Sequence, residues 1–253
     1  MKEFDQRLTN DGLAIFPAVI GREQLEQLRL DADIAYRKCR KIQEMNGVDF
    51  PRVAHHIIKS VWRDSSFYDL LDNLPLKEYI DDYMGGPYIL NTISAIFNYQ
   101  NAASELENRP HRDMRSYFPV RLSINVIIFL DDFTESNGST LFLKGSHLKQ
   151  DMPSDDEFFE GAEKMLGEAG SIALFNSDLV HSGGMNVTES TRRCIVYTLH
   201  RPFIKTQFDY STLVEASDSD WLKQLLGYHS RTAKTLEEWY QPPEHRMYKA
   251  GQG

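Results

Sequence analysis

The stretch GSIALFNSDLVHSGGMNVTESTRRCIVYTLHRPF, residues 170–203, decides the fold class. It holds two strand-length apolar segments, 170–181 and 192–203, joined by residues rich in Gly, Ser, Thr and Asn. β-Branched and aromatic residues favour strands, whereas clusters of small polar residues and glycine favour turns. Because no helical pattern separates the two segments, they predict antiparallel strands and not a parallel βαβ unit.

Three further strand-length segments lie upstream of this stretch. They are YILNTISAIFNYQ (88–100), RLSINVIIFLDDF (121–133) and STLFLKGSH (139–147), with Gly, Asn, Asp and Pro clusters between them. Such a run of strands indicates an antiparallel sandwich or barrel. The piece 150–169 is acidic and predicts a loop with a short helix.

Helical patterns flank the strands on both sides. After the short apolar run GLAIFPAVI (12–20), apolar residues recur at three-four spacing: Leu25, Leu28, Ala32, Ala35, Cys39 and Ile42. That spacing predicts an amphipathic helix that ends near Asn46-Gly47. Residues 65–83 predict two shorter helices broken at Pro75, and SDWLKQLLG and TAKTLEEWY predict helix near the C-terminus.

These patterns predict one domain over residues 1–253, mainly β with flanking helices. Its expected parts are a helical region over about 1–87, a β core over about 88–203 and a helical segment over about 204–253. Hydrophobic residues make up 41% and charged residues 26% of the chain. This balance is ordinary for a folded globular protein and excludes a mainly disordered one.

Charge and hydropathy argue against two classes of partner. The formal net charge is −9 and no basic block occurs, so a surface that follows nucleic-acid phosphates is not expected. No apolar run approaches the roughly 18 residues that span a bilayer, and the start MKEFDQRLTNDG is too polar for a signal peptide. We therefore expect a cytoplasmic protein with neither nucleic-acid nor membrane partners. Cys39 and Cys194 lack CxxC spacing and are expected to be reduced thiols.

His111 and Asp113 stand two apart in RPHRDMRSYF (109–118). In an extended segment, side chains at this spacing point to the same side and can converge on one metal ion. The motif alone is weak, because surface loops carry HxD by chance. His181 ends an apolar strand and offers a third ligand. Two histidines and one carboxylate are the ligands of non-haem Fe(II) oxygenases, whereas zinc, the rival, usually takes its histidines from an HExxH helix that this chain lacks.

Arg192 follows His181 by eleven residues, on the segment TRRCIVYTL. A guanidinium that faces a protein interior is costly unless it meets an anion, so an inward Arg192 predicts a ligand with a carboxylate. The alternative is a solvated arginine at a strand edge. Arg193 is predicted to be such a residue, because adjacent strand residues face opposite ways.

The chain resembles the phytanoyl-CoA dioxygenase family of Fe(II)- and 2-oxoglutarate-dependent oxygenases. The resemblance rests on the ordered series DGLAIFPAVIGREQLEQLR, HRD, FLDDFTESNGSTLFLKGSH and GSIALFNSDLVHSGGMNVTESTRRCIVY, and it covers most of residues 10–203. It implies a double-stranded β-helix, a cupin-like jelly-roll barrel with helices outside. It also implies that His111, Asp113 and His181 bind the iron and that Arg192 binds the distal carboxylate of 2-oxoglutarate.

The resemblance extends to residues around these four. Asn98 matches a position that helps to hold the C1 carboxylate of 2-oxoglutarate, and Ser94 lies on the same strand face; ordinary polar strand residues are the alternative. Some relatives have a hydroxyl two residues after the arginine, where this chain has Cys194, a poorer hydrogen-bonding group. Asn137-Gly138 predicts a tight turn with positive φ.

The remaining histidines are not expected to bind the metal. His147 is expected to be a hydrogen-bonded loop residue, and His55 and His56 are candidates only for the rim of the pocket. A structural or surface role is expected for His200, His229 and His245.

The implied reaction oxidises an unactivated C–H bond with O2 and 2-oxoglutarate, and succinate and CO2 are the coproducts. Asp113 favours hydroxylation because related halogenases have a small residue there, but substrate placement also permits desaturation, cyclisation or epimerisation. Arg115, Tyr117 and Arg121 follow the HxD and suit a small polar substrate, with solvated loop residues as the alternative. A protein side chain as substrate, and a barrel that binds a ligand without catalysis, are the rival functions. Oligomeric state is not readable from the sequence.

Overall fold

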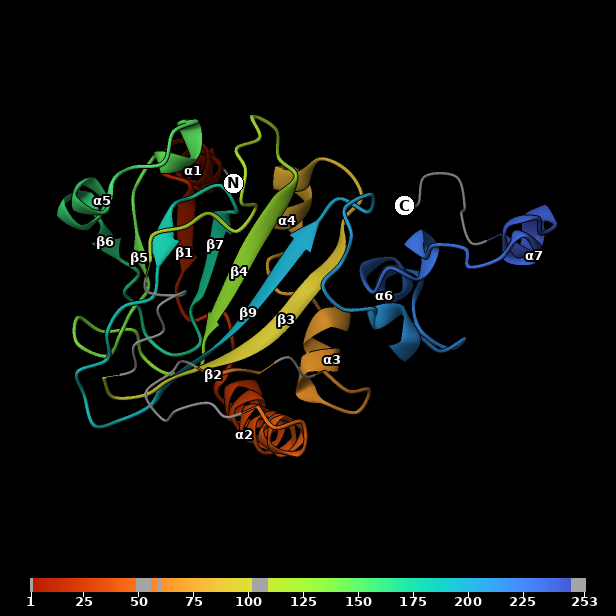
Figure 1. Cartoon of the computed structure of the whole chain (residues 1–253), viewed down its shortest axis with the longest axis horizontal. Coiled ribbons are helices and arrows are strands. Elements are labelled where there is room, and N and C mark those ends of the chain that lie inside the picture. The colour runs from red at the N-terminus through yellow and green to blue at the C-terminus, as the bar shows by residue number, and fades with distance from the viewer. Residues whose placement is uncertain (1, 49–55, 59–60, 102–108, 247–253) are drawn as a thin grey trace.

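The strands of the computed structural model, which describes residues 2–48, 56–58, 61–101 and 109–246, form two antiparallel sheets (Figure 1). The large sheet has the order β1 (Leu13–Phe16), β7 (Ile172–Asn176), β4 (Ser123–Phe129), β9 (Arg192–His200), β3 (Ile89–Asn98) and β2 (His56–Ile58). The small sheet has the order β6 (Glu163–Lys164), β5 (Leu141–Phe142) and β8 (His181–Ser182). The predicted fold class, mainly β with helices, is confirmed. The described pairing leaves two separate sheets, so closure into one barrel stays a prediction.

Helices cover one face of the large sheet (Figure 1). The helices that contribute to this layer are α1 (Lys2–Asn10), α2 (Arg22–Met45), α3 (Ser66–Asp72), α4 (Lys77–Met84) and α6 (Asp220–Leu225). Two shorter helices lie at opposite ends of the molecule in Figure 1: α5 (Asp155–Gly161) beside β6, and α7 (Leu236–Trp239) near the C-terminus. Single 3-10 turns occur at Ser146–Leu148, Tyr210–Leu213, Tyr228–Ser230 and Pro243–His245.

Alternation along the strands sorts the buried side chains into two cores. On β9, Ile195, Tyr197 and Leu199 join the core under the helices. Cys194 points the other way and joins a second core with residues of the small sheet, among them Phe142. Because successive strand residues face opposite sides, β1, β3, β4, β7 and β9 each have an inner face that contributes to this second core. The inner face is where the candidate site lies.

The predicted helices agree with the structure except at their ends. Helix α2 ends at Met45 with Asn46 as its C-cap, and α3 and α4 flank Pro75 as expected. The apolar face of α2 is buried at Leu25 and Leu28, but Ile42 is 49% exposed. The last turns of α2 therefore extend beyond the core that covers the rest of the helix.

Two strand predictions were too long. The segment 170–181 contains β7 and β8, separated by a turn in which the Asp178 amide donates to Asn176 Oδ1. The segment 139–147 keeps β5 and then turns at Gly145, whose φ is 73°. In both cases a polar side chain or a glycine stabilises a turn inside an apolar pattern.

Helix α1 and the short strands β2 and β6 were not predicted, and some predicted residues lie outside the described part of the chain. The polar start of the chain forms α1, which packs Leu8 into the larger core, and His56–Ile58 pairs with β3. The side chain of His56, the whole of His55 and the tail 247–253 lie outside the described residues.

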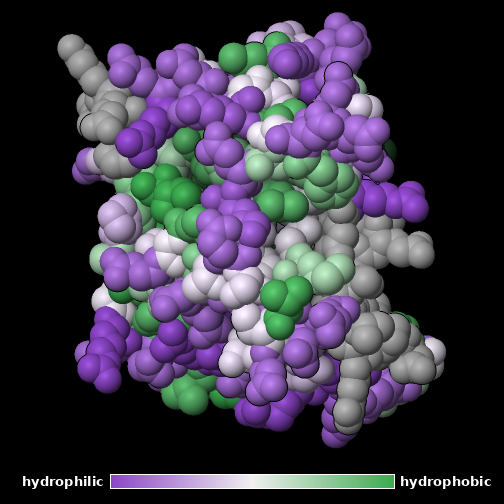
Figure 2. All heavy atoms as spheres, turned by 90° about the vertical axis from the view of Figure 1, so that its left-hand side faces the viewer, coloured by the Kyte–Doolittle hydropathy of each residue, from purple (hydrophilic) through white to green (hydrophobic). Residues whose placement is uncertain are grey.

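No helix among the described residues has the length and apolar character needed to cross a bilayer. The face over α5 and the small sheet is mainly hydrophilic with separate hydrophobic patches (Figure 2). Exposed apolar side chains of the neighbouring segment are Leu148, Met152, Phe159 and Leu166.

An ion pair joins the start of α3 to the segment before α6. Asp218 accepts two hydrogen bonds from the Arg63 guanidinium, at 3.0 and 2.7 Å, and one from the Tyr68 hydroxyl at 2.9 Å. The hydrogen bond from Arg63 is the main cause that lowers the pKa of Asp218 below its usual range. The carboxylate therefore stabilises the fold above its unfolded-state pKa of about 3.9, and this contribution falls as pH decreases toward the folded-state pKa.

We expect Asp218→Asn to lower the free energy of unfolding at pH 7. The difference from the parent protein should shrink below about pH 4, because the unfolded parent then takes up a proton at Asp218, which reduces the advantage of the ionised pair in the folded state. Urea unfolding of both proteins from pH 7 to pH 3 measures this, with the exposed Glu244→Gln as the control. A difference that stays constant over this range would contradict the assignment.

Candidate functional site

His111 and His181 are brought together by backbone pairing. The His111 amide donates to the His181 carbonyl and the His181 amide donates to the His111 carbonyl, each at 3.0 Å. His181 also starts β8, so His111 adds one antiparallel bridge beside the small sheet. The two imidazole centroids are 4.4 Å apart. Residues 70 positions apart in the sequence thus present their rings to one point.

Backbone carbonyls orient both imidazoles in the same way. His111 Nδ1 is 2.9 Å from the Arg109 carbonyl, and His181 Nδ1 is 2.9 Å from the Leu179 carbonyl. A carbonyl accepts hydrogen bonds, so Nδ1 of each neutral ring carries the proton and Nε2 keeps a free electron pair. Metal-binding histidines are commonly fixed by such a bond from the other ring nitrogen.

Asp113 completes the group. Its Oδ1 is 3.7 Å from His111 Nε2 and its Oδ2 is 3.8 Å from His181 Nε2. The three potential ligand atoms lie within 4.8 Å of one another, and no other such group of His, Cys, Asp and Glu occurs among the described residues. Two imidazole nitrogens and one carboxylate fit Fe(II) or another divalent transition metal. The structure therefore brings the three predicted ligands together.

Burial of the site favours the neutral, metal-binding form of His111. It lowers the pKa of His111, and the neighbouring His181 lowers it further. A neutral imidazole is the form that binds a metal, so the lowered pKa extends metal binding to lower pH. Phe175 on β7 packs against the His181 ring with centroids 5.1 Å apart and shields it on one side.

Arg192 faces the inner side of the large sheet, as predicted. It is 4% exposed, and its guanidinium donates to the Gly138 carbonyl at 2.6 Å and to Cys194 Sγ at 3.2 Å. Its charge also lies 4.3 Å from the centre of the Phe133 ring. A buried guanidinium on the same inner face as the ligand group fits a carboxylate such as that of 2-oxoglutarate. Cys194, expected to be a poor partner for the cosubstrate, contacts the arginine itself.

Asn98 and Ser94 lie on the inner face of β3, and the alternation predicted for them is present. Asn98 is fully buried and pairs with Arg192 across the strands. Its amide nitrogen donates to the carbonyls of Gly138 and Gly184, at 3.1 and 3.0 Å. These bonds tie two loops to the end of β3, so a contact of Asn98 with 2-oxoglutarate stays a prediction.

Gly138 occupies the predicted turn and has a positive φ of 78°. The space around it also requires a residue without a side chain. A Cβ at this position would lie 2.2 Å from Asn98 Nδ2 and 2.7 Å from the Gly184 carbonyl oxygen. Gly85, with φ of 61°, has no atom within 4 Å of such a Cβ. The two glycines share a left-handed backbone and differ in the space around them.

We expect Gly138→Ala to destabilise the protein by about 1–3 kcal/mol more than Gly85→Ala does. The left-handed backbone costs alanine about 1–2 kcal/mol at either position, and overpacking adds about 1–3 kcal/mol at Gly138 alone. Denaturant unfolding of both variants measures the difference. Equal losses would mean that the turn at Gly138 yields without disturbing Asn98.

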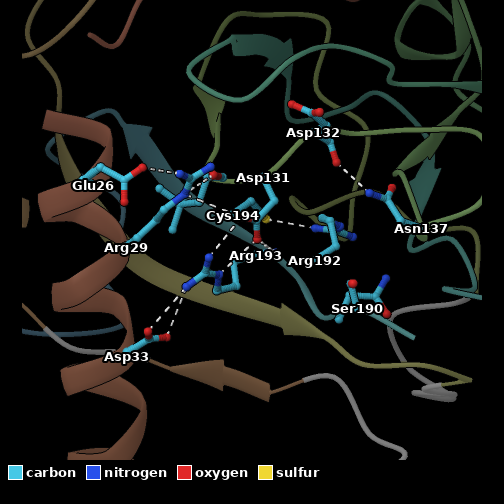
Figure 3. A network of polar contacts seen from close by, with 12 residues as sticks. Glu26, Arg29, Asp33, Asp131, Asp132, Asn137, Ser190, Arg192, Arg193 and Cys194 are labelled. Carbon is cyan, nitrogen blue, oxygen red and sulfur yellow. Dashed lines mark hydrogen bonds and ion pairs between the residues drawn. The ribbon is translucent and has the colours of Figure 1, made fainter. Parts of the chain in front are cut away.

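The prediction that Arg193 is a solvated edge residue is wrong. Figure 3 shows Arg192 and Arg193 on opposite sides of β9, and Arg193 points toward α2. Its guanidinium donates to both oxygens of Asp131 at 3.0 Å and lies 3.4 Å from Asp33. The two arginines face opposite sides, as predicted, but on the outer side of β9 Asp33 of α2 and Asp131, which follows β4, are acidic partners.

The three proposed substrate residues have different surroundings. Arg115 is exposed and close enough to the site that its charge lowers the pKa of His111. Tyr117 is half-buried and packs against the buried Arg112 guanidinium. Arg121 donates to the Tyr83 carbonyl at 3.2 Å and stacks on the Tyr83 ring, which favours a structural role over the predicted substrate contact.

His147, His200 and the two cysteines have the expected structural roles. His147 Nε2 is 3.0 Å from the Thr9 carbonyl, as expected for a hydrogen-bonded loop residue. His200 is buried, and burial lowers its pKa to about 4, so it stays neutral. Cys39 and Cys194 are both free thiols.

A large open cavity of about 1010 Å³ lies away from this group, between residues 202–212 and 226–245. None of the predicted ligands or cosubstrate residues lines it. It also lacks the histidine and carboxylate cluster that distinguishes the inner face. The chemistry of the three ligands therefore locates the candidate site better than cavity size does.

Two residues next to the ligands were not predicted. Arg112 lies between His111 and Asp113 in the sequence and is 5% exposed. Asn125 interrupts the apolar run of β4, is fully buried and donates to Asp113 Oδ2 at 2.6 Å. For Asn125, the sequence signal is a polar residue inside an apolar strand pattern that predicts burial. For Arg112, the signal is a charged residue between two predicted ligands.

Comparison with known proteins supports the family resemblance. A family model described as "Phytanoyl-CoA dioxygenase (PhyH)" matches residues 8–194. Uncharacterized protein Rv1501 of Mycobacterium tuberculosis is 36% identical over 135 residues, which are 52% of this chain and 50% of the relative. The match thus spans about half the length of that relative. Dioxygenase trt7 of Aspergillus terreus is 25% identical over 269 residues, covering 100% of this chain and 88% of the relative.

A solved structure shares the fold. HygX from Streptomyces hygroscopicus, determined with nickel and 2-oxoglutarate bound, superimposes with a TM-score of 0.61 at 17% identity. The likeness covers 87% of this chain and 96% of HygX. At this identity it concerns the fold and not the reaction.

Proposed function

This chain belongs to the phytanoyl-CoA dioxygenase family, and on that premise we propose that it is an Fe(II)- and 2-oxoglutarate-dependent dioxygenase that hydroxylates a small polar molecule. The observation that carries the proposal is the convergence of His111, Asp113 and His181 within 4.8 Å, with both Nδ1 atoms bonded to carbonyls. When bound, Fe(II), 2-oxoglutarate and O2 supply the oxidising power, and succinate and CO2 are released.

The chain's own residues bind and orient these groups. The three ligands hold the metal through His111 Nε2, His181 Nε2 and one oxygen of Asp113, and they leave part of its coordination sphere to other molecules. Arg192 supplies a charged, buried donor for the distal carboxylate of 2-oxoglutarate. Between Arg192 and the ligand group, the inner face carries apolar side chains, including Phe129 and the partly buried Val196, which exclude water.

The substrate is proposed to enter past Arg115 and Tyr117. Arg115 is exposed close to His111, so it suits an anionic or strongly polar substrate. The placement of the substrate's C–H bond decides between hydroxylation and desaturation, cyclisation or epimerisation. Cytoplasmic location and a single domain stay predictions.

The test has two parts. Without oxygen, the protein with Fe(II) and 2-oxoglutarate should show the weak visible charge-transfer absorption of the chelate. With oxygen, pooled metabolites and, separately, peptides should be screened for substrate-stimulated succinate formation. Absence of the absorption band would refute the oxygenase assignment, and stimulation by peptides alone would replace the small-molecule substrate with a protein side chain. A band without succinate formation in any pool would favour a barrel that binds 2-oxoglutarate without catalysis.

A further inference from the structure

Asn125 is the fully buried amide on the inner face of β4. The strand reads SINVIIF, and the register places Asn125 between Thr198 on β9 and Phe175 on β7. Phe175 packs against His181, and Asn125 contacts Asp113, so one row of the sheet touches two of the three ligands. A buried amide costs stability unless its donor and acceptor are satisfied.

A chain of two short hydrogen bonds fixes the amide. Asn125 Nδ2 donates to Asp113 Oδ2 at 2.6 Å, and the Thr198 hydroxyl donates to Asn125 Oδ1 at 2.6 Å. An ionised carboxylate only accepts hydrogen bonds, so the amide nitrogen has to face Asp113. The amide oxygen then faces Thr198, whose hydroxyl satisfies it.

We propose that Asn125, held by Thr198, is a positioning residue that keeps Asp113 in its metal-binding orientation and reserves Oδ1 for the metal. The inference rests on the proposed metal site. An amide bonded to one oxygen of a carboxylate occupies one of that oxygen's acceptor sites and so favours binding of a cation through the other oxygen. Oδ1 lies 3.7 Å from His111 Nε2, and Oδ2, which accepts the bond from Asn125, lies 3.8 Å from His181 Nε2. The hydrogen bond, and not the distance to the imidazoles, therefore distinguishes the two oxygens.

The surroundings of the hydrogen bond from Asn125 to Asp113 strengthen it. It is charge-assisted and lies against a fully buried residue, where low local dielectric strengthens hydrogen bonds to ionised groups. Asp113 itself is 36% exposed at its side chain, so without Asn125 the carboxylate can rotate toward solvent. Holding it in place lowers the conformational entropy that metal binding would otherwise cost.

The main test is a Co(II) titration of the metal-free protein, followed by the Co(II) absorption spectrum. We expect the nearly isosteric Asn125→Leu to raise the Kd for Co(II) by about 10–100-fold, the range for partners that hydrogen-bond to metal ligands. The absorption bands should also change, because Asp113 gains a second free oxygen. Ser123→Ala is the matched control: Ser123 lies on the same strand and face, is buried, and donates to the Leu199 carbonyl, and Kd should stay within threefold.

Variants of Thr198 provide a second test, which can be carried out even if the Asn125→Leu protein does not fold. Thr198→Val removes the hydroxyl at nearly constant volume and should weaken Co(II) binding, whereas Thr198→Ser keeps the hydroxyl and should restore it. In the double variant with Asn125→Leu, the valine substitution should add little, because Thr198 acts through the amide.

The outcomes separate this inference from the proposed function. If the parent protein binds Co(II) through the two histidines and Asp113, but Asn125→Leu and Thr198→Val leave Kd and spectrum unchanged, the positioning role is refuted. If Thr198→Ser weakens Co(II) binding as much as Thr198→Val does, the proposed role of the Thr198 hydroxyl in holding Asn125 is refuted. If the parent does not bind Co(II), the metal site itself is refuted.

Discussion

Replacing His181 with alanine is expected to abolish 2-oxoglutarate turnover and to weaken divalent metal binding by at least about 100-fold. Loss of a bond to the metal should exceed the 10–100-fold effect of losing a partner of a ligand. The effect should not come from unfolding, because β8 is held by the backbone bonds between His181 and His111, which alanine keeps. His111→Ala should behave alike, since the two rings have equivalent carbonyl partners.

The measurement is a titration of the metal-free protein with Co(II), combined with succinate formation under saturating Fe(II) and 2-oxoglutarate. His245→Ala is the matched control, because His245 is an exposed histidine far along the chain from the ligands. Its metal affinity and turnover should equal those of the parent. A His181→Ala protein that binds Co(II) within threefold of the parent would place the metal elsewhere and remove the basis of the proposed function.

The ligand set could be predicted from the sequence because its signals are local. His111 and Asp113 are two apart, and His181 ends an apolar segment next to glycines. Strand alternation likewise predicted that Arg192 and Arg193 face opposite sides. The opposite orientation of Arg192 and Arg193 depends on the period of a strand, which every residue in the segment shares. Asp113 lies in a turn, so for His111 and Asp113 the signal is only their short spacing.

The surroundings of the ligands could not be predicted, because they depend on which strands are neighbours. The bond from Asn125 to Asp113 requires β4 to lie beside the loop that carries the HxD motif. Arg193 is not a solvated edge residue because α2 covers the outer face of β9 and supplies Asp33. Short elements were also missed: β2 and β8 are three and two residues long, too short to show a period. Sequence patterns thus predicted the candidate ligands, and tertiary packing decides which residues contact them.

Arg112→Ala is expected to lower the free energy of unfolding by about 3 kcal/mol or more. Arg112 lies between the two ligands in the sequence, and its side chain is buried in the protein. The guanidinium donates to five backbone carbonyls, those of Asp178, Gln150, Ser146, Lys149 and Asp151. Without it, several of these acceptors lose their partner, and a buried unsatisfied acceptor costs about 1–3 kcal/mol.

The same contacts link stability to the metal site. Arg112 connects the HxD segment to the Asp178 carbonyl, three residues before His181, and to the loop 146–151. Its charge also opposes the increase in pKa that burial gives the Asp178 carboxyl. We therefore expect Arg112→Ala to weaken Co(II) binding as well, because His111 and Asp113 lose the anchor that sets them against His181.

Arg115→Ala is the control for Arg112→Ala in urea unfolding of the metal-free protein. Arg115 lies in the same loop but is exposed, so its loss should change stability by no more than about 0.5 kcal/mol. Arg112→Lys should be intermediate, since an ammonium donates hydrogen bonds but cannot span five carbonyls as a planar fork does. If Arg112→Ala unfolds within about 0.5 kcal/mol of the parent, water replaces the guanidinium at these carbonyls, and the arginine between the ligands is not what anchors them.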